Sequence, residues 1–181
     1  MGKYVTKKKD MYFKDIESMQ PIANVINEAA LALKDKSHTI SNSSISEVLS
    51  GALGAGVGGG ASFAALYGLG LTGLSAAGIT SGLATAGAIV GGGMVAGVFV
   101  LAAPVAALSA AGVGIASKLK ANKLKSEKER VFAEAVAKQN AIIKALQNEK
   151  TADKNRIDCL NGINILLERA IKDLKHDLGV A

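Results

Sequence analysis

VLSGALGAGVGGGASFAALYGLGLTGLSAAGITSGLATAGAIVGGGMVAGVFVLAAPVAALSAAGVGIAS, residues 48–117, is a run of 70 residues without a single Asp, Glu, Lys, Arg or His. It holds 18 of the chain's 21 glycines, and all of the charged side chains lie on either side of it. Since the other 111 residues are too few to cover so large an uncharged block in water, we expect the block to lie in a membrane. The chain then divides into an N-terminal arm (1–47), a Gly/Ala-rich membrane domain (48–117) and a basic flank with a helical hairpin (118–181).

Local breakers divide the uncharged block into three runs. Val48–Leu71 and Met94–Ser117 each have the length of a helix that crosses a hydrocarbon core about 30 Å thick. Ser75–Val90 between them is shorter and ends at a glycine triplet, so we interpret it as a re-entrant helix. Pro104 removes a backbone hydrogen bond inside the last run and predicts a kink there. The expected fold class is all-α, with a two-span transmembrane hairpin and a short re-entrant helix.

Small residues recur at steps of four through this block, a pattern by which membrane helices bring their backbones into contact. One stripe is unbroken from Ala52 to Ala76, and glycine pairs repeat the step further on. Some pairs arise by chance in so glycine-rich a segment, so the stripes either pack the chain's own helices together or face other copies in an oligomer. The predicted helix-packing residues are Ala52, Gly56, Gly60, Ala64, Gly68, Gly78, Gly82, Gly87, Gly91, Gly93 and Gly97.

Lysines mark the end of the uncharged block. Lys118, Lys120, Lys123 and Lys125 follow it at once, as is typical of a cytoplasmic flank. The N-terminal ten residues are basic and lack the apolar run of a secretory signal. We therefore expect both termini in the cytoplasm and an even number of crossings, in the inner membrane if the chain is bacterial. The lysine flank either only sets this topology or also binds anionic lipid headgroups, at about 1 kcal/mol for each lysine.

The N-terminal arm carries the signals of two helix starts. Pro21–Lys36 has apolar residues at steps of three and four, with Pro21 suited to the first turn, so we expect a short amphipathic helix. Ser44 and Glu47 have the spacing of a capping box, which predicts a second helix beginning near Ile45.

The C-terminal arm has two long helical patterns, Leu124–Gln147 and Arg156–Leu178, joined by a polar turn in which Thr151 would cap the second helix. Such a pair of patterns predicts an antiparallel hairpin of coiled-coil type. The apolar stripe expected to form the interface of its second helix is Leu160, Ile163, Leu167, Ile171, Leu174 and Leu178.

The sequence offers little for chemistry. His38 and His176 lie far apart and are expected at the surface, and the lone Cys159 is expected to be a small buried residue. These three are too few for a structural zinc site. The GxGxxG spacing at Gly54–Gly59 has neither a preceding strand nor a following acidic residue, so it does not indicate a dinucleotide site. We expect no enzyme activity, no metal and no cofactor, and the acids among the C-terminal lysines argue against nucleic-acid binding.

Residues 72–97, TGLSAAGITSGLATAGAIVGGGMVAG, carry a family resemblance. The segment resembles the shared core of the interferon-alpha-inducible small membrane proteins, over about one seventh of the chain, whereas both arms differ from that family. The resemblance implies a small helical protein of an organelle membrane, linked to innate defence and cell death, without catalytic residues. The positions that match are Gly73, Ser75, Gly78, Ile79, Ser81 and Gly91–Gly93.

Together these features predict an oligomerising membrane protein that permeabilises or remodels a bilayer through glycine-zipper helix packing. Its partners would be the lipid bilayer and further copies of the chain. One alternative is a membrane-anchored adaptor whose C-terminal hairpin binds a protein partner. Another is a soluble self-assembling particle or filament with a Gly/Ala-rich core.

Overall fold

The computed structural model describes residues 4–5, 7–55, 61–69, 113–149 and 152–180, and all regular elements in these ranges are helical. The all-α fold class is therefore confirmed for this part of the chain. Two compact units are present, one formed by residues 1–71 and 125–181 and the other by residues 72–124. We call the described residues of the first unit the helical body. The elements are η1 (Lys8–Asp10), η2 (Glu17–Met19), α1 (Gln20–Lys34), η3 (Ile40–Asn42), α2 (Ser46–Ala55), α3 (Phe63–Leu69), α6 (Val113–Asn148) and α7 (Lys154–Leu178).

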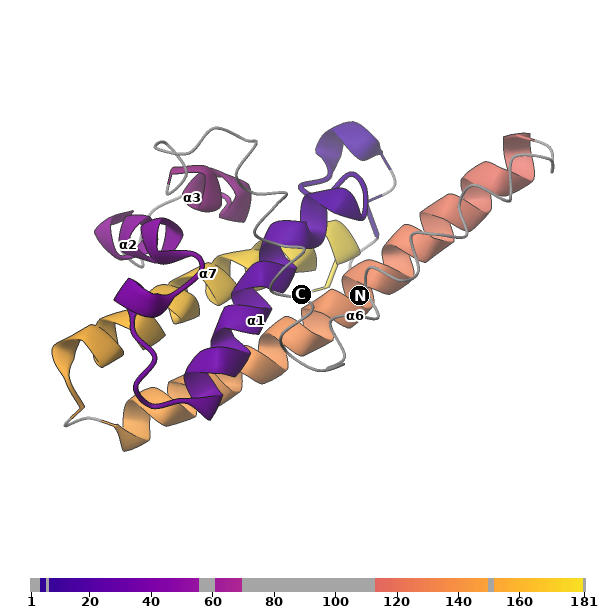
Figure 1. Cartoon of the computed structure of the whole chain (residues 1–181). Coiled ribbons are helices and arrows are strands. Elements are labelled where there is room, and N and C mark those ends of the chain that lie inside the picture. The colour runs from indigo at the N-terminus through magenta and orange to yellow at the C-terminus, as the bar shows by residue number, and fades with distance from the viewer. Residues whose placement is uncertain (1–3, 6, 56–60, 70–112, 150–151, 181) are drawn as a thin grey trace. The chain divides into compact units, whose positions relative to one another are not determined.

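Helix α7 is the centre of the helical body, with α1, α2 and α3 packed against it (Figure 1). Its buried residues cover a broad arc rather than a narrow stripe, while Glu168 and Lys172 on the remaining face are exposed. All six residues of the predicted interface stripe are among them, from Leu160 to Leu178. The three-and-four spacing thus picked out residues that are buried, and α7 packs against α1, α2 and α3 of the N-terminal half as well as forming the hairpin with α6.

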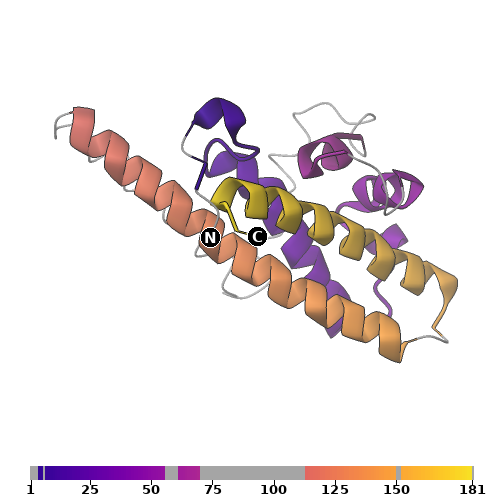
Figure 2. The same cartoon turned by 180° about the vertical axis from the view of Figure 1, so that it is seen from behind.

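Helices α6 and α7 form the predicted antiparallel hairpin, side by side in both views (Figures 1 and 2). Three side-chain contacts fix its register. Lys128 donates to Asp177 at 2.8 Å, Gln139 to Asn164 at 3.4 Å, and Arg156 to Glu149 at 3.0 Å. The residue numbers rise along α6 while they fall along α7, which confirms the antiparallel arrangement. Helix α6 begins at Val113 rather than at Leu124, because the lysine flank contains mostly good helix formers.

Both ends of α7 are defined by local hydrogen bonds. The side chain of Asp153 caps the first turn by accepting from the backbone N–H of Asn155 at 2.8 Å. At the other end Gly179 has a φ of 64°, and the backbone N–H of Val180 donates to the carbonyl of Lys175 at 3.0 Å. This left-handed glycine ends the helix in a Schellman motif. Thr151, the predicted cap, lies outside the described residues.

The run Val48–Leu71 differs from the prediction of one membrane-length helix. It contains two short helices, α2 and α3, with non-helical residues 61–62 before α3. Leu49 and Leu66 are fully buried in the helical body. The expected single span is incorrect because these apolar side chains find protein rather than lipid as their partner. No helix in the described ranges is long and apolar enough to cross a membrane.

The other predicted membrane elements lie elsewhere in the chain. The re-entrant run Ser75–Val90, the glycine triplet, the kink at Pro104 and most of the run Met94–Ser117 fall outside the described residues. They stay predictions from the sequence.

Candidate functional site

The predicted helix-packing residues in the first apolar run do not share one buried face. Ala52 is buried on α2, whereas Ala64 and Gly68 on α3 are exposed. Gly56, Gly60 and the predicted glycines from Gly78 to Gly97 lie outside the described residues.

The close approach of backbones occurs instead at Gly162 of α7, which the sequence analysis missed. A Cβ atom there would lie 3.2 Å from the carbonyl oxygen of Leu49. The available signal was an isolated glycine inside a strong helical pattern, which commonly marks close packing.

The lysines of the flank differ in their exposure to solvent. Lys120 and Lys125 are exposed, and Lys125 pairs with Glu129 one turn later at 3.6 Å. Lys123 is partly exposed and interacts with another group of the protein. The side chain of Lys118 lies outside the described part.

Near the end of α7 a buried ion pair joins three segments of the chain. Asp177 and Lys128 are both fully buried, and the lysine Nζ donates to the carboxylate at 2.8 Å. The same carboxylate accepts the backbone N–H groups of Tyr12 at 2.9 Å and Phe13 at 3.0 Å. We call the described residues among 4–16 the N-terminal strap. Asp177 thus ties the strap to the α6–α7 hairpin, and its buried charge is balanced by a cation and two donors.

The aromatic ring of Tyr4 covers this ion pair from the strap. The Nζ atoms of Lys125 and Lys128 lie 5.6 and 5.7 Å from the centre of the ring, within the range of a cation–π contact. Burial, and then the negative charges of Asp177 and Glu129, raises the pKa of the Tyr4 hydroxyl. That hydroxyl therefore stays protonated at neutral pH.

A second buried carboxylate on α7 lies one turn before the first. Asp173, which is 5% exposed, accepts the backbone N–H of Phe63 at 2.7 Å and so holds the beginning of α3. The rings of Phe63 and Phe13 lie 6.4 Å apart, so the segments held by Asp173 and Asp177 are neighbours. Burial raises the pKa of Asp173, the Phe63 N–H opposes this shift, and the nearby Asp177 adds to it.

His38 is buried and not at the surface as expected. Its Nε2 atom contacts Glu28 on α1, and the hydroxyl of Ser44 donates to the other oxygen of the same carboxylate at 3.0 Å. The serine bonds to the acid rather than to the histidine, so the three do not form a nucleophile and base pair. The capping box expected at Ser44 is found instead at Thr39 and Asn42, at the start of η3.

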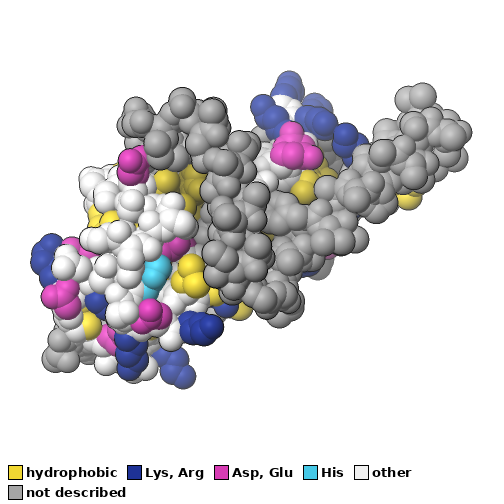
Figure 3. Space-filling view, viewed as in Figure 1, with side chains coloured by type: hydrophobic (Ala, Val, Ile, Leu, Met, Phe, Trp, Pro, Cys, Tyr) yellow, Lys and Arg dark blue, Asp and Glu magenta, His cyan; other side chains and the backbone are white. Residues whose placement is uncertain are grey.

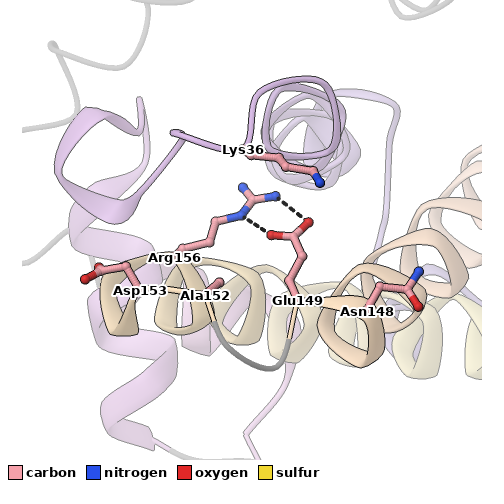
Figure 4. A pocket seen from close by; sticks show the side chains of 6 residues that line it. All are labelled: Lys36, Asn148, Glu149, Ala152, Asp153 and Arg156. Carbon is pink, nitrogen blue, oxygen red and sulfur yellow. Dashed lines mark hydrogen bonds and ion pairs between the residues drawn. The ribbon is translucent and has the colours of Figure 1, made fainter.

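A hollow of about 350 Å³ lies beside the turn of the hairpin (Figure 4). Figure 4 shows the Arg156 guanidinium facing Glu149, with Lys36 across from them. Arg156 is 3% exposed and also donates to the backbone carbonyls of Ala32 at 2.7 Å and His38 at 3.2 Å. These acceptors belong to the end of α1 and the following loop. Arg156 is therefore a structural clamp between α1 and the hairpin. The hollow is lined by Lys36, Asn148, Glu149, Ala152, Asp153 and Arg156.

Cys159 is fully buried, as expected from the sequence. Burial, followed by the negative charge of Glu28, raises the pKa of its thiol to about 11. A thiol with this pKa is protonated at neutral pH and is a poor nucleophile. Within the described ranges, no group of three or more His, Cys, Asp and Glu side chains could hold a metal ion.

No protein-family model, curated protein or solved structure matches this chain. The charged contacts described above join segments that are distant in sequence, and they hold the helical body together. Two features remain from which a function can be argued: the surface of the body, and the uncharged sequence between α3 and α6.

Proposed function

We propose that this chain is an oligomerising membrane protein that permeabilises or remodels a bilayer, and that residues 70–112 are the inserted segment. The observation that carries the proposal is a run of 43 residues in this segment without an ionisable side chain. Because α2 and α3 already bury their apolar side chains in the helical body, the membrane-inserted part is shorter than the whole uncharged block.

The length of this segment suits two crossings of about 20 residues each. In this arrangement residues 71–90 and 94–112 cross the bilayer, and the glycine triplet 91–93 turns between them. Two crossings return the chain to the side from which it left, which agrees with polar sequence before and after the segment. The helical body and the lysine flank would then lie on the same side of the membrane.

Self-association is supported by the small residues of this segment. Gly78 and Gly82, Gly87 and Gly91, and Gly93 and Gly97 repeat the four-residue step that allows helix backbones to touch in lipid. Serines and threonines between them would give a helix-lined passage a polar but uncharged wall. The resemblance to the interferon-alpha-inducible small membrane proteins falls on these same residues, and the proposal does not depend on it.

The adaptor alternative predicts that the hairpin offers a binding surface to another protein. Helix α7 packs against α1, α2 and α3, and all residues of its apolar stripe are buried. An adaptor would therefore have to use the outward face of α6, where Ile143 is 37% exposed. This reduces the support for the adaptor function, which stays a second prediction.

Dye release from sealed vesicles tests the proposal with a charge placed inside the segment. Lysine inside a crossing costs up to about 2.5–3.5 kcal/mol, the value at the centre, so Val98→Lys in the first half of the second crossing is expected to reduce strongly the release given by the unaltered chain. Ala64→Lys is the matched control, because Ala64 is exposed on α3 and the substitution adds the same charge to the helical body. Vesicles that stay sealed at a high ratio of unaltered protein to lipid would overturn the pore-forming proposal.

Alkaline carbonate washing separates the proposal from a soluble particle or filament. A chain that spans the bilayer stays with the membrane pellet, and Val98→Lys should move part of it to the supernatant. If the unaltered chain is washed off completely, the soluble assembly becomes the better description.

A further inference from the structure

The strap is anchored so that its lysines stay at the surface. Met11 and Phe13 are buried, at 8% and 2% exposed, and Asp177 holds the backbone at Tyr12 and Phe13. Earlier in the strap, the backbone N–H of Val5 donates to the carbonyl of Asp177 at 3.1 Å. Lys7–Lys9 lie between these two anchors and are all exposed. The positions of three consecutive positive charges are thus restrained from both sides.

The last turns of α7 bring more positive charge to the same place. Lys172 is exposed, Lys175 is partly exposed, and the ring of His176 lies 4.9 Å from the ring of Tyr12 in the strap. Residues 7–16 and 172–180 together contain six lysines and four acids. Two of the four acids, Asp173 and Asp177, are buried and bound to backbone N–H groups, whereas Asp10 and Asp15 are exposed. The exposed charge is therefore positive.

Exposed apolar groups accompany these lysines. Tyr12 and Val180 are 48% and 49% exposed. Figure 3 shows dark-blue lysine and arginine side chains gathered over the N-terminal strap. We call the exposed residues of the strap and of the last turns of α7 the strap surface.

We propose that the strap surface docks on an anionic bilayer, with its lysines at the lipid phosphates and with Tyr12 and Val180 at headgroup level. Basic side chains mixed with an amphipathic aromatic residue are typical of a membrane–water interface. This inference rests on the proposed function, because both place the chain at a membrane. It adds a contact made by the folded helical body, separate from the inserted segment.

The attraction is electrostatic, so it has a characteristic salt dependence. Exposed charges are screened over about 10 Å at 0.1 M salt and over about 3 Å at 1 M salt. Docking through the strap surface should therefore be reversed by salt, whereas a helix that crosses the bilayer should stay in place. The two kinds of membrane contact are distinguishable by this difference alone.

The test measures sedimentation of the full chain with vesicles of phosphatidylcholine, with and without phosphatidylglycerol, at low salt. The triple variant Lys7→Gln, Lys8→Gln and Lys9→Gln is expected to bind anionic vesicles on the order of 100-fold less tightly, since each lysine near such a surface contributes about fivefold. Binding to neutral vesicles should not change. Lys34→Gln, Lys36→Gln and Lys144→Gln form the control, because all three lysines are exposed and lie outside the strap surface.

Making the same measurement in the Val98→Lys chain separates this inference from the proposed function. If vesicles never leak but salt-reversible binding still depends on Lys7–Lys9, the docking surface stands and the pore fails. If the unaltered chain causes leakage while the Val98→Lys chain does not bind anionic vesicles at low salt, the docking surface is overturned and the pore stands. The docking surface would also be overturned if the strap variant and the control variant lost the same amount of vesicle binding. Tighter binding of the chain to a single-stranded oligonucleotide than to the vesicles would overturn it as well.

Discussion

At the residue scale, the stability of the helical body depends on charged groups that water does not reach. Lys128 donates to one oxygen of Asp177 at 2.8 Å, and both side chains are fully buried, whereas Nδ1 of the exposed His176 lies 3.3 Å from the other oxygen. Lys128→Met would leave the carboxylate buried with its two backbone donors but without that cation. We expect the free energy of unfolding to fall by about 3–5 kcal/mol, measured by urea denaturation.

Lys144→Met is the control for this change, because Lys144 is exposed on the same helix. Its effect should stay within about 0.5 kcal/mol. Similar stability of the two variants would show that the buried pair does not hold the strap and the hairpin together.

The second residue-scale prediction concerns the pH dependence contributed by Asp173. Its pKa is raised above 3.8 in the folded state, mainly by burial. Between 3.8 and the folded pKa the folded chain binds more protons than the unfolded chain, so this group favours folding most at low pH. The contribution is lost as the pH rises through the folded pKa.

Asp173→Asn keeps an oxygen that accepts the Phe63 N–H but cannot ionise. The stability of this variant relative to the unaltered chain should therefore increase as the pH rises from about 3 to about 8. Urea denaturation across this pH range measures the difference in unfolding free energy between the two chains. The contributions of the other titrating groups, which both chains share, cancel in this difference. The charged groups around Asp173 are Arg169, Lys172 and Asp177 on its own helix. Glu168→Gln is the control, since this carboxylate is exposed on the same helix.

At the element scale, periodicity predicted the long helices well. The spacing of apolar residues identified α1, α7 and the antiparallel hairpin, and the last helix buries all six residues of its predicted stripe. Hydropathy could not separate α2 and α3 from a membrane span, because a leucine has the same hydropathy whether lipid or α7 covers it. Phe63 and Leu66 are buried on α3, which packs against a helix more than 80 residues later in the chain.

The close packing of α2 on α7 gives a prediction for Gly162. The Cβ of Gly162→Ala would lie 3.2 Å from the carbonyl oxygen and 3.3 Å from the Cδ2 atom of Leu49. Since the carbonyl belongs to the backbone of α2, it cannot move without shifting that helix. We expect a loss of about 1–3 kcal/mol in unfolding free energy, which exceeds the gain of up to about 1 kcal/mol in helix propensity.

Gly54→Ala is the matched control in α2, because a Cβ there meets nothing within 4 Å. It should stabilise the chain by up to about 1 kcal/mol in the same denaturation experiment. Stabilisation by both substitutions would contradict the close contact between α2 and α7.

At the scale of the whole molecule, the candidate docking surface could be predicted only in part. The sequence shows the lysines of the strap, but it does not show that Asp177 holds the strap against the end of α7. His38 looked like a surface residue because its neighbours are polar, although Glu28, ten residues earlier, pairs with it inside the body. Local sequence patterns do not show which distant residues bind the buried polar groups.

In the proposed function, residues 70–112 lie in the bilayer and the helical body lies outside it. Single cysteines in a Cys159→Ala chain test this directly when they carry a fluorophore and the reconstituting lipids carry nitroxide quenchers on their acyl chains. We predict strong quenching at Val98→Cys and little at Ala64→Cys, which lies on the exposed side of α3. Equal and weak quenching at both positions would contradict the insertion of the uncharged segment.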